Sequence, residues 1–179
     1  MKSDRRVKYT KMVLRNSLIQ LLNEKPFEKI TIKELCQRAD VNRGTFYVHY
    51  NDQEDLLQQI QDELIEGMQN LCEKSGCKKS DWFKYVRENK DAVLCLYSHK
   101  ATKSFAERIN SLLREYLKIS VKDRGIKDEG KNEILFDYLV SGIVGCTLHW
   151  LTRNCPCDDE QLICLLERLW QGTVSEFVK

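Results

Sequence analysis

Apolar residues recur three and four positions apart along nearly the whole chain, which is the spacing of one face of an α-helix. Only 2 Pro and 8 Gly interrupt the 179 residues. No segment alternates apolar and polar residues as a half-buried strand would. The sequence therefore predicts an all-α fold of about nine helices. We expect a three-helix domain over residues 1–51 and a larger helical domain over residues 52–179.

The two expected domains differ in charge. Residues 1–51 contain 11 Lys and Arg against 5 Asp and Glu, a net charge of +6, whereas residues 52–179 have a net charge of −4. A basic region joined to an acidic remainder favours a polyanionic partner, such as nucleic acid, for the basic region alone. A solvated basic face would have the same composition, so charge alone does not decide between them.

Nothing in the sequence predicts contact with a membrane. The first residues are polar and charged, without the apolar segment of a signal peptide. The most apolar stretch, residues 139–151, is too short to span a bilayer and is interrupted by Gly and His. We therefore expect a cytoplasmic protein.

Local signals near the N-terminus predict a helix-turn-helix. Thr31 and Glu34 have the spacing of a capping box at the start of a second helix. Residues 40–42 form a tight turn, and Asn42 is a suitable N-cap for a third helix over residues 43–50. Such a motif inserts the start of its last helix into the major groove of DNA.

The side chains at the start of this third helix suit DNA. Arg43 can make a bidentate contact to guanine, and Thr45 can meet a base or a phosphate. Gly44 allows close approach of the backbone. Tyr47 and His49 lie further along and can donate to phosphates.

The opposite side of the same helix carries Phe46 and Tyr50, which we expect to be buried. Pairs of short helices also occur as plain structural corners. The outward-facing residues and the basic charge are what favour DNA binding over that alternative.

The stretch from residue 30 to residue 50, ITIKELCQRADVNRGTFYVHY, resembles the TetR family of regulators. It has the family's opening Thr, its Ala-x-Val turn, its small polar cap and its run of aromatic residues. The resemblance covers residues 9–57. It implies a dimeric regulator that binds double-stranded DNA at an operator and is not an enzyme.

Carried over by position, the resemblance implies that Thr31 caps its helix and touches a phosphate. Lys33 would reach DNA from the second helix. The expected DNA-binding residues are Thr31, Lys33, Asn42, Arg43, Gly44, Thr45, Tyr47, His49 and Gln53.

This sequence departs from the family pattern at two positions. Asp40 stands where the family usually has Gly, so the turn is expected to differ slightly. Gln53 stands where a Lys often grips a phosphate. The second change puts one phosphate contact in doubt and predicts a shallower salt dependence.

The last two expected helices resemble the dimerisation helices of the family, in a form common among Gram-positive regulators. The first of them is apolar nearly all round, so every face needs a cover. Packing within one chain is the alternative to a homodimer. The expected interface residues are Ser141, Gly142, Gly145, Cys146, Trp150, Leu162, Leu166, Leu169 and Trp170.

The larger domain also contains aromatic residues that could line a pocket for a small apolar or aromatic effector. Aromatic residues at helical spacing more often form a core, so both interpretations stand. The candidate pocket residues are Trp82, Tyr85, Tyr97, Phe105, Tyr116, Phe136 and Tyr138.

The favoured function is a homodimeric repressor that an effector releases from a palindromic operator. The alternative is a DNA-binding regulator or activator that responds to a protein partner or to thiol or metal chemistry. Cys155 with Cys157, and Cys72 with Cys77, are the cysteine pairs such chemistry would use. We find no catalytic constellation, no full set of metal ligands and no cofactor motif.

Overall fold

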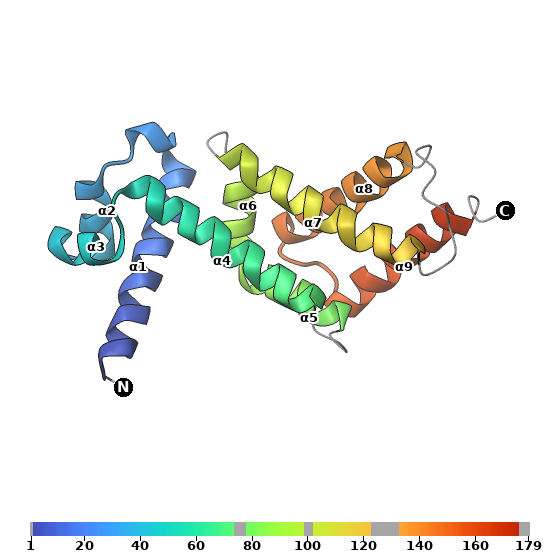
Figure 1. Ribbon diagram of the computed structural model, residues 1–179, viewed down its shortest axis with the longest axis horizontal. Helices are drawn as coiled ribbons and strands as arrows, with labels where there is room; N and C mark the ends of the chain where they lie inside the picture. Colours follow the sequence, from blue (N-terminus) through green and yellow to red (C-terminus); the bar gives the residue numbers. More distant parts are fainter. Residues whose placement is uncertain (1, 74–77, 99–101, 123–132, 176–179) are drawn as a thin grey trace. The chain divides into compact units, whose positions relative to one another are not determined.

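The computed structural model describes residues 2–73, 78–98, 102–122 and 133–175, and over these ranges it is almost entirely helical, with no strand (Figure 1). The predicted all-α fold is confirmed. The described helices are α1 (Lys2–Glu24), the 3-10 helix η1 (Phe27–Lys29), α2 (Ile32–Ala39), α3 (Arg43–His49), α4 (Gln53–Glu73), α5 (Lys79–Glu88), α6 (Lys90–Ser98), α7 (Lys103–Lys122), α8 (Glu133–Thr152) and α9 (Asp159–Ser175).

The chain divides into two compact units. The first comprises Met1–Leu64 with Cys95–Lys103, and the second comprises Ile65–Leu94 with Ser104–Lys179. Because α4 contributes to both units, this division falls inside a helix. The predicted functional boundary at residues 51–52 stays a prediction.

The core of the first unit is built where α1, α2, α3 and α4 meet. Leu14, Leu18, Leu35, Phe46 and Leu56 are completely buried there. Burial on α1 begins at Leu14, since the side chains of residues 5–13 are all half-buried or exposed. The first turns of α1 therefore extend beyond the packed core, as the dark blue helix in Figure 1 shows.

In the second unit, α5 packs against α9. Arg87 forms an ion pair with Asp159 at 2.8 Å, and the rings of Phe83 and Trp150 meet edge to face with centroids 6.4 Å apart. Gly67 on α4 makes room for Tyr85, because a Cβ at residue 67 would lie 2.1 Å from the Tyr85 hydroxyl.

The start of α9 has a reciprocal capping box. Asp158 accepts a hydrogen bond from the Gln161 amide at 2.8 Å, and the Gln161 side chain accepts from the Asp158 amide at 3.3 Å. This cap satisfies two of the amides that a helix start leaves without intrahelical partners.

Helix α8 is the most apolar element of the described chain. By length and composition alone it could cross a membrane. This is weak evidence, because the core helix of a soluble protein has the same properties, and eight residues of α8 are buried within the subunit.

Candidate nucleic-acid interface

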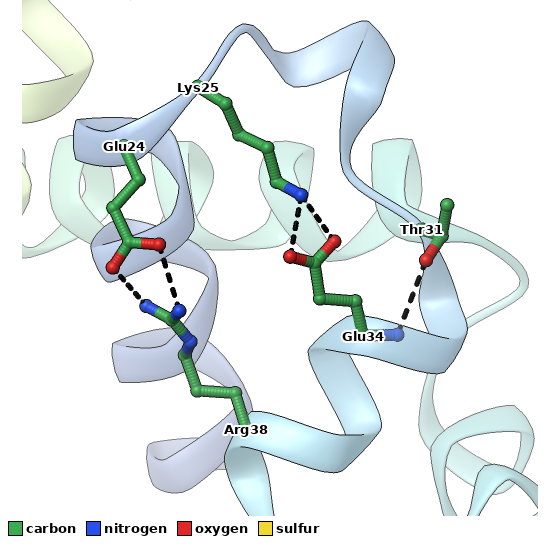
Figure 2. A network of polar contacts seen from close by, with 5 residues as sticks. All are labelled: Glu24, Lys25, Thr31, Glu34 and Arg38. Carbon is green, nitrogen blue, oxygen red and sulfur yellow. Dashed lines mark hydrogen bonds and ion pairs between the residues drawn. The ribbon is translucent and has the colours of Figure 1, made fainter.

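Helix α2 begins at a capped Thr. The Thr31 hydroxyl accepts a hydrogen bond from the Glu34 amide at 3.3 Å. We expected the Glu34 side chain to return this bond, but its two carboxylate oxygens instead lie 2.5 Å from the Lys25 ammonium (Figure 2). Glu34 thus ties the first turn of α2 to Lys25, the residue that follows α1.

A second ion pair joins the same two elements. The Arg38 guanidinium donates to both carboxylate oxygens of Glu24, at 2.5 and 2.8 Å (Figure 2). This hydrogen-bonded pairing lowers the pKa of Glu24 and raises the pKa of Arg38. Exposed ion pairs add little stability, but two parallel hydrogen bonds constrain how the end of α2 lies against the end of α1.

The turn between α2 and α3 depends on one left-handed residue. Asp40 has φ 51° and ψ 45°, and the Val41 amide donates to the Cys36 carbonyl at 3.0 Å. This arrangement closes the end of a helix and usually places Gly at the left-handed position. Asp tolerates that conformation better than most residues, so the turn keeps its form although Gly is absent.

Helix α3 begins with an Asn cap that lies close to the next residue but one. The Asn42 side-chain oxygen accepts from the Gly44 amide at 2.7 Å. A Cβ at residue 44 would lie 3.3 Å from that oxygen, which is a tight contact. A methyl group at residue 44 would therefore press only lightly on the cap.

The two sides of α3 differ as expected. Phe46 is completely buried and Tyr50 nearly so, which confirms that this side belongs to the core. The exposed side carries Arg43, Gly44, Thr45, Tyr47 and Val48.

Val48 was not predicted to belong to this surface. It is nevertheless 76% exposed, more than any other large apolar residue of α3. Its position gave the signal, since it lies three residues after Thr45 and four after Gly44. His49, by contrast, is half-buried.

The end of α3 is anchored on α1. The rings of Phe46 and Tyr50 lie 5.6 Å apart, and the Lys11 ammonium lies 6.0 Å from the centre of the Tyr50 ring. Burial, with smaller contributions from Glu63 and Asp55, raises the pKa of Tyr50 to about 12. Tyr50 therefore stays neutral and packs as a core residue.

The start of α4 is tightly capped. Asp52 accepts from the Asp55 amide at 2.8 Å, and the Asp55 carboxylate accepts from the Asn51 amide at 2.9 Å. The second bond, with a further one from Gln59, lowers the pKa of Asp55. Gln53 is the first residue of α4 and is half-buried.

The other predicted DNA-binding residues, Thr31, Lys33 and Asn42, are exposed. The structure thus brings together the capped starts of α2 and α3 and the outward side of α3. The part that each residue plays in DNA binding stays a prediction.

The predicted dimer residues fall into two groups. Ser141, Gly142, Gly145 and Leu169 are exposed, and Cys146 is half-buried. The remaining four, Trp150, Leu162, Leu166 and Trp170, are buried by their own chain.

Three exposed apolar residues near these positions were not predicted to belong to the dimer surface, namely Ile134, Tyr138 and Leu165. Tyr138 had been assigned to a ligand pocket instead. A helix that is apolar all round does not indicate which of its sides remains uncovered, so only the structure separates the two groups.

The candidate pocket residues are likewise distributed. Phe105 and Phe136 are completely buried, whereas Trp82, Tyr85, Tyr97 and Tyr116 are half-buried. Tyr138 is 66% exposed, which favours a surface role for it. Tyr97 belongs to the first compact unit and the other six to the second.

The cysteines of the loop before α9 are half-buried thiols. Burial raises the pKa of Cys155 in spite of the nearby Arg87 and Lys90. A raised pKa disfavours the thiolate that redox and metal chemistry require. Cys72 is also half-buried, and Cys77 lies outside the described residues.

Comparison with known proteins identifies the family. Residues 16–60 match the family model described as bacterial regulatory proteins, tetR family, and residues 79–172 match one described as a transcriptional regulator C-terminal region. The chain belongs to the TetR family. It is therefore a DNA-binding transcriptional regulator and not an enzyme.

A curated relative of this TetR-family chain is an uncharacterized HTH-type transcriptional regulator, YxbF, of Bacillus subtilis (strain 168). It is 29% identical over 55 residues, which cover 31% of this chain and 14% of that protein. The similarity is therefore confined to a small part of the relative.

Solved structures extend the likeness over the whole fold. A TetR regulator from Streptococcus agalactiae 2603V has a TM-score of 0.61 at 23% identity, covering 94% of this chain and 97% of its own. A TetR-family regulator from Syntrophomonas wolfei has a TM-score of 0.64 at 15% identity, with 93% and 96% covered. The dihydroxyacetone kinase operon activator DhaS has a TM-score of 0.59 at 16% identity, with 94% and 96% covered.

Proposed function

We propose that this TetR-family regulator is a cytoplasmic homodimeric repressor that binds a palindromic operator through α2 and α3 and leaves it when an effector binds. The observation that carries the proposal is the outward side of α3. It combines a long cationic donor, a glycine and a hydroxyl at the start of the helix with an apolar residue one turn later.

Each of these groups has a counterpart in the major groove. Arg43 would donate to guanine O6 and N7, and the Val48 side chain would meet a thymine methyl group. Thr45 would contact a base or a phosphate, and Thr31, Lys33, Tyr47 and Gln53 would hold the backbone. Both helix starts keep their caps without using these outward side chains, apart from Thr31.

Support for a homodimer comes from the uncovered apolar sides of α8 and α9. Ile134 is 81% exposed, and Tyr138 lies one turn further along the same side. Gly142 and Gly145 continue that side, and a Cβ at either residue would meet no atom within 4 Å. On α9, Leu165 and Leu169 are about half exposed. A second copy would cover both sides and could approach closely over the glycines.

Two-fold symmetry also suits the operator. Two recognition helices related by a dimer axis bind two half-sites about one helical turn apart, or a multiple of it. One seven-residue helix contacts too few base pairs to select one site among many on its own.

The direction of regulation is the least constrained part of the proposal. One structural neighbour is named an operon activator, so an activator that answers to a protein partner is the alternative. The raised pKa of Cys155 disfavours a thiol signal.

Selection of DNA from a random duplex pool by the purified full chain tests the proposal. We expect an enriched inverted repeat, bound by a dimer, whose presence ahead of a reporter gene lowers expression when the chain is present. A reporter that is raised instead would favour the activator.

Arg43→Ala should weaken binding to the selected site by about tenfold or more and relax the preference at one base of each half-site, because a bidentate contact contributes about 1–3 kcal/mol of discrimination. Arg153→Ala, at an exposed residue after α8, is the control. A pool with no enriched sequence would contradict the proposal.

A further inference from the structure

The positive charge of the N-terminal region is concentrated before the helix-turn-helix. Residues 1–15 contain six Lys and Arg and one Asp, a net charge of +5, whereas residues 16–51 contain five Lys and Arg and four Asp and Glu, a net charge of +1. The base-reading motif is therefore nearly neutral. Since neutralising phosphates supplies much of the affinity for DNA, that affinity needs another source in this chain.

Four of these six cations, Arg5, Arg6, Lys8 and Lys11, lie on the part of α1 before Leu14, where no described side chain is fully buried. Burial on α1 begins at Leu14, and Arg5, Arg6 and Lys8 are exposed. Tyr9 and Met12 are also exposed, so the segment presents long side chains rather than a covered face. We define residues 5–13 of α1 as the basic segment.

The basic segment leaves the core beside the DNA-reading helix. Lys11 lies against the ring of Tyr50, the residue that caps the C-terminal end of α3. Arg5 and Arg6 precede Lys11 by five or six residues, which places them about 8 Å further along the helix axis. In Figure 1 these turns extend beyond α2 and α3. The offset is comparable to the major groove's width of about 12 Å.

We propose that the basic segment of α1 is a second DNA-binding surface, which contacts backbone phosphates beside the half-site that α3 occupies and does not depend on sequence. Charge complementarity and continuity with the helix-turn-helix select duplex DNA as the occupant. This inference rests on the proposed function, because it assumes that α3 meets DNA.

The division of work follows from the charges. The outward side of α3 chooses the sequence, and Arg5 and Arg6 supply the salt-dependent attraction that Gln53 does not provide at the start of α4. The shallow salt dependence expected from Gln53 alone is then offset by α1.

The test measures binding to the selected duplex as a function of salt, for the full chain and for the double variant Arg5→Gln with Arg6→Gln. We expect the slope of log affinity against log salt to fall by about 2 for each bound subunit, since each lost phosphate contact removes about 0.9. Affinity near physiological salt should fall about tenfold or more, with the preferred sequence unchanged. Glutamine is a good helix former, so α1 should persist.

The matched control is Lys84→Gln with Arg153→Gln, which removes the same charge from exposed residues of the second unit. If both double variants have the same slope, the inference is overturned. A changed base preference in the Arg5 and Arg6 variant would also overturn it, because the segment would then recognise bases. If the unaltered chain selects no sequence, the proposed function itself fails, and this outcome is distinct from the other two.

Discussion

The outward side of α3 and the uncovered sides of α8 and α9 are both exposed, yet their chemistry differs. On α3, charged and polar groups surround a single exposed valine. On α8 and α9, the exposed residues include glycines and the large apolar side chains of Ile134, Tyr138, Leu165 and Leu169, beside polar and charged ones. The first surface suits a hydrated polyanion and the second an apolar partner, so we expect the two surfaces to bind by different physical means.

Because the two surfaces differ, disrupting each one should abolish a different property. Loss of the α3 contacts should remove sequence preference while leaving the dimer intact. Loss of the α8 and α9 contacts should leave the α3 surface intact on each subunit but separate the two copies. The following predictions test this separation.

Leu169→Glu on α9 should have the largest effect. Dimerisation would bury a carboxylate from each subunit without a partner, which is costly, so the dimer dissociation constant should rise by at least about hundredfold. Analytical ultracentrifugation measures the change. Ile119→Glu on α7, at a residue of similar exposure, is the control and should leave the dimer unchanged. Equal behaviour of the two variants would contradict the interface.

Gly44→Ala tests the DNA-binding surface without touching the dimer. Its Cβ would press on the Asn42 cap by only a few tenths of an ångström, so the free energy of unfolding should change by less than about 0.5 kcal/mol. Affinity for DNA should nevertheless fall about tenfold, because the methyl group keeps the backbone from its close approach. Thermal melting and a band-shift assay measure the two effects. Unchanged affinity would show that the α3 backbone stays away from the DNA.

Gln61→Met should raise the stability of the first unit. Gln61 lies within a buried stripe of α4 between Leu57 and Leu64, and its side-chain oxygen has no hydrogen-bond partner among the described residues. Removing an unsatisfied buried polar group should add about 1–2 kcal/mol to the free energy of unfolding. Denaturant unfolding measures it, with the exposed Gln69→Met as control. A less stable Gln61→Met variant would mean that the amide makes a needed contact.

The smallest expected effect is a pH dependence at Cys95. Burial raises the pKa of this thiol to about 11, above the value near 8.5 of an unfolded chain. Its contribution to stability is therefore complete below pH 8.5 and is lost as the pH rises towards 11. The melting temperature of the unaltered chain should fall more steeply over this range than that of Cys95→Ala. Cys164→Ala, at an exposed thiol, should behave like the unaltered chain.

The two surfaces also differ in how well the sequence predicts them. The caps at Thr31 and Asn42 were both predicted, because a cap involves residues two or three positions apart. The hydrogen-bond partner of the Glu34 side chain was not predicted, because that partner, Lys25, lies nine residues away. Local signals thus specify the helix-turn-helix, and tertiary contacts decide what they leave open.

The second unit shows the opposite case. The capping box of Asp158 and Gln161 joins residues only three positions apart, so it is a local signal. The uncovered side of α8 is not a local property. Apolar residues occupy every side of that helix, so the periodicity of the sequence does not indicate which side faces the core. Trp150 is buried against Phe83 of α5, whereas Tyr138 is exposed, and this information is not local.

The ion pairs that join α1 to α2 have a consequence for experiments in salt. The Lys25–Glu34 and Arg38–Glu24 pairs are partly exposed, so dissolved ions weaken them as well as any phosphate contacts. Ionic strength then has two effects on DNA binding by this regulator. It weakens the phosphate contacts, and it weakens the ion pairs that hold α2 in place. Comparing variants that all retain these pairs cancels the second effect, and the remaining difference in slope counts phosphates alone.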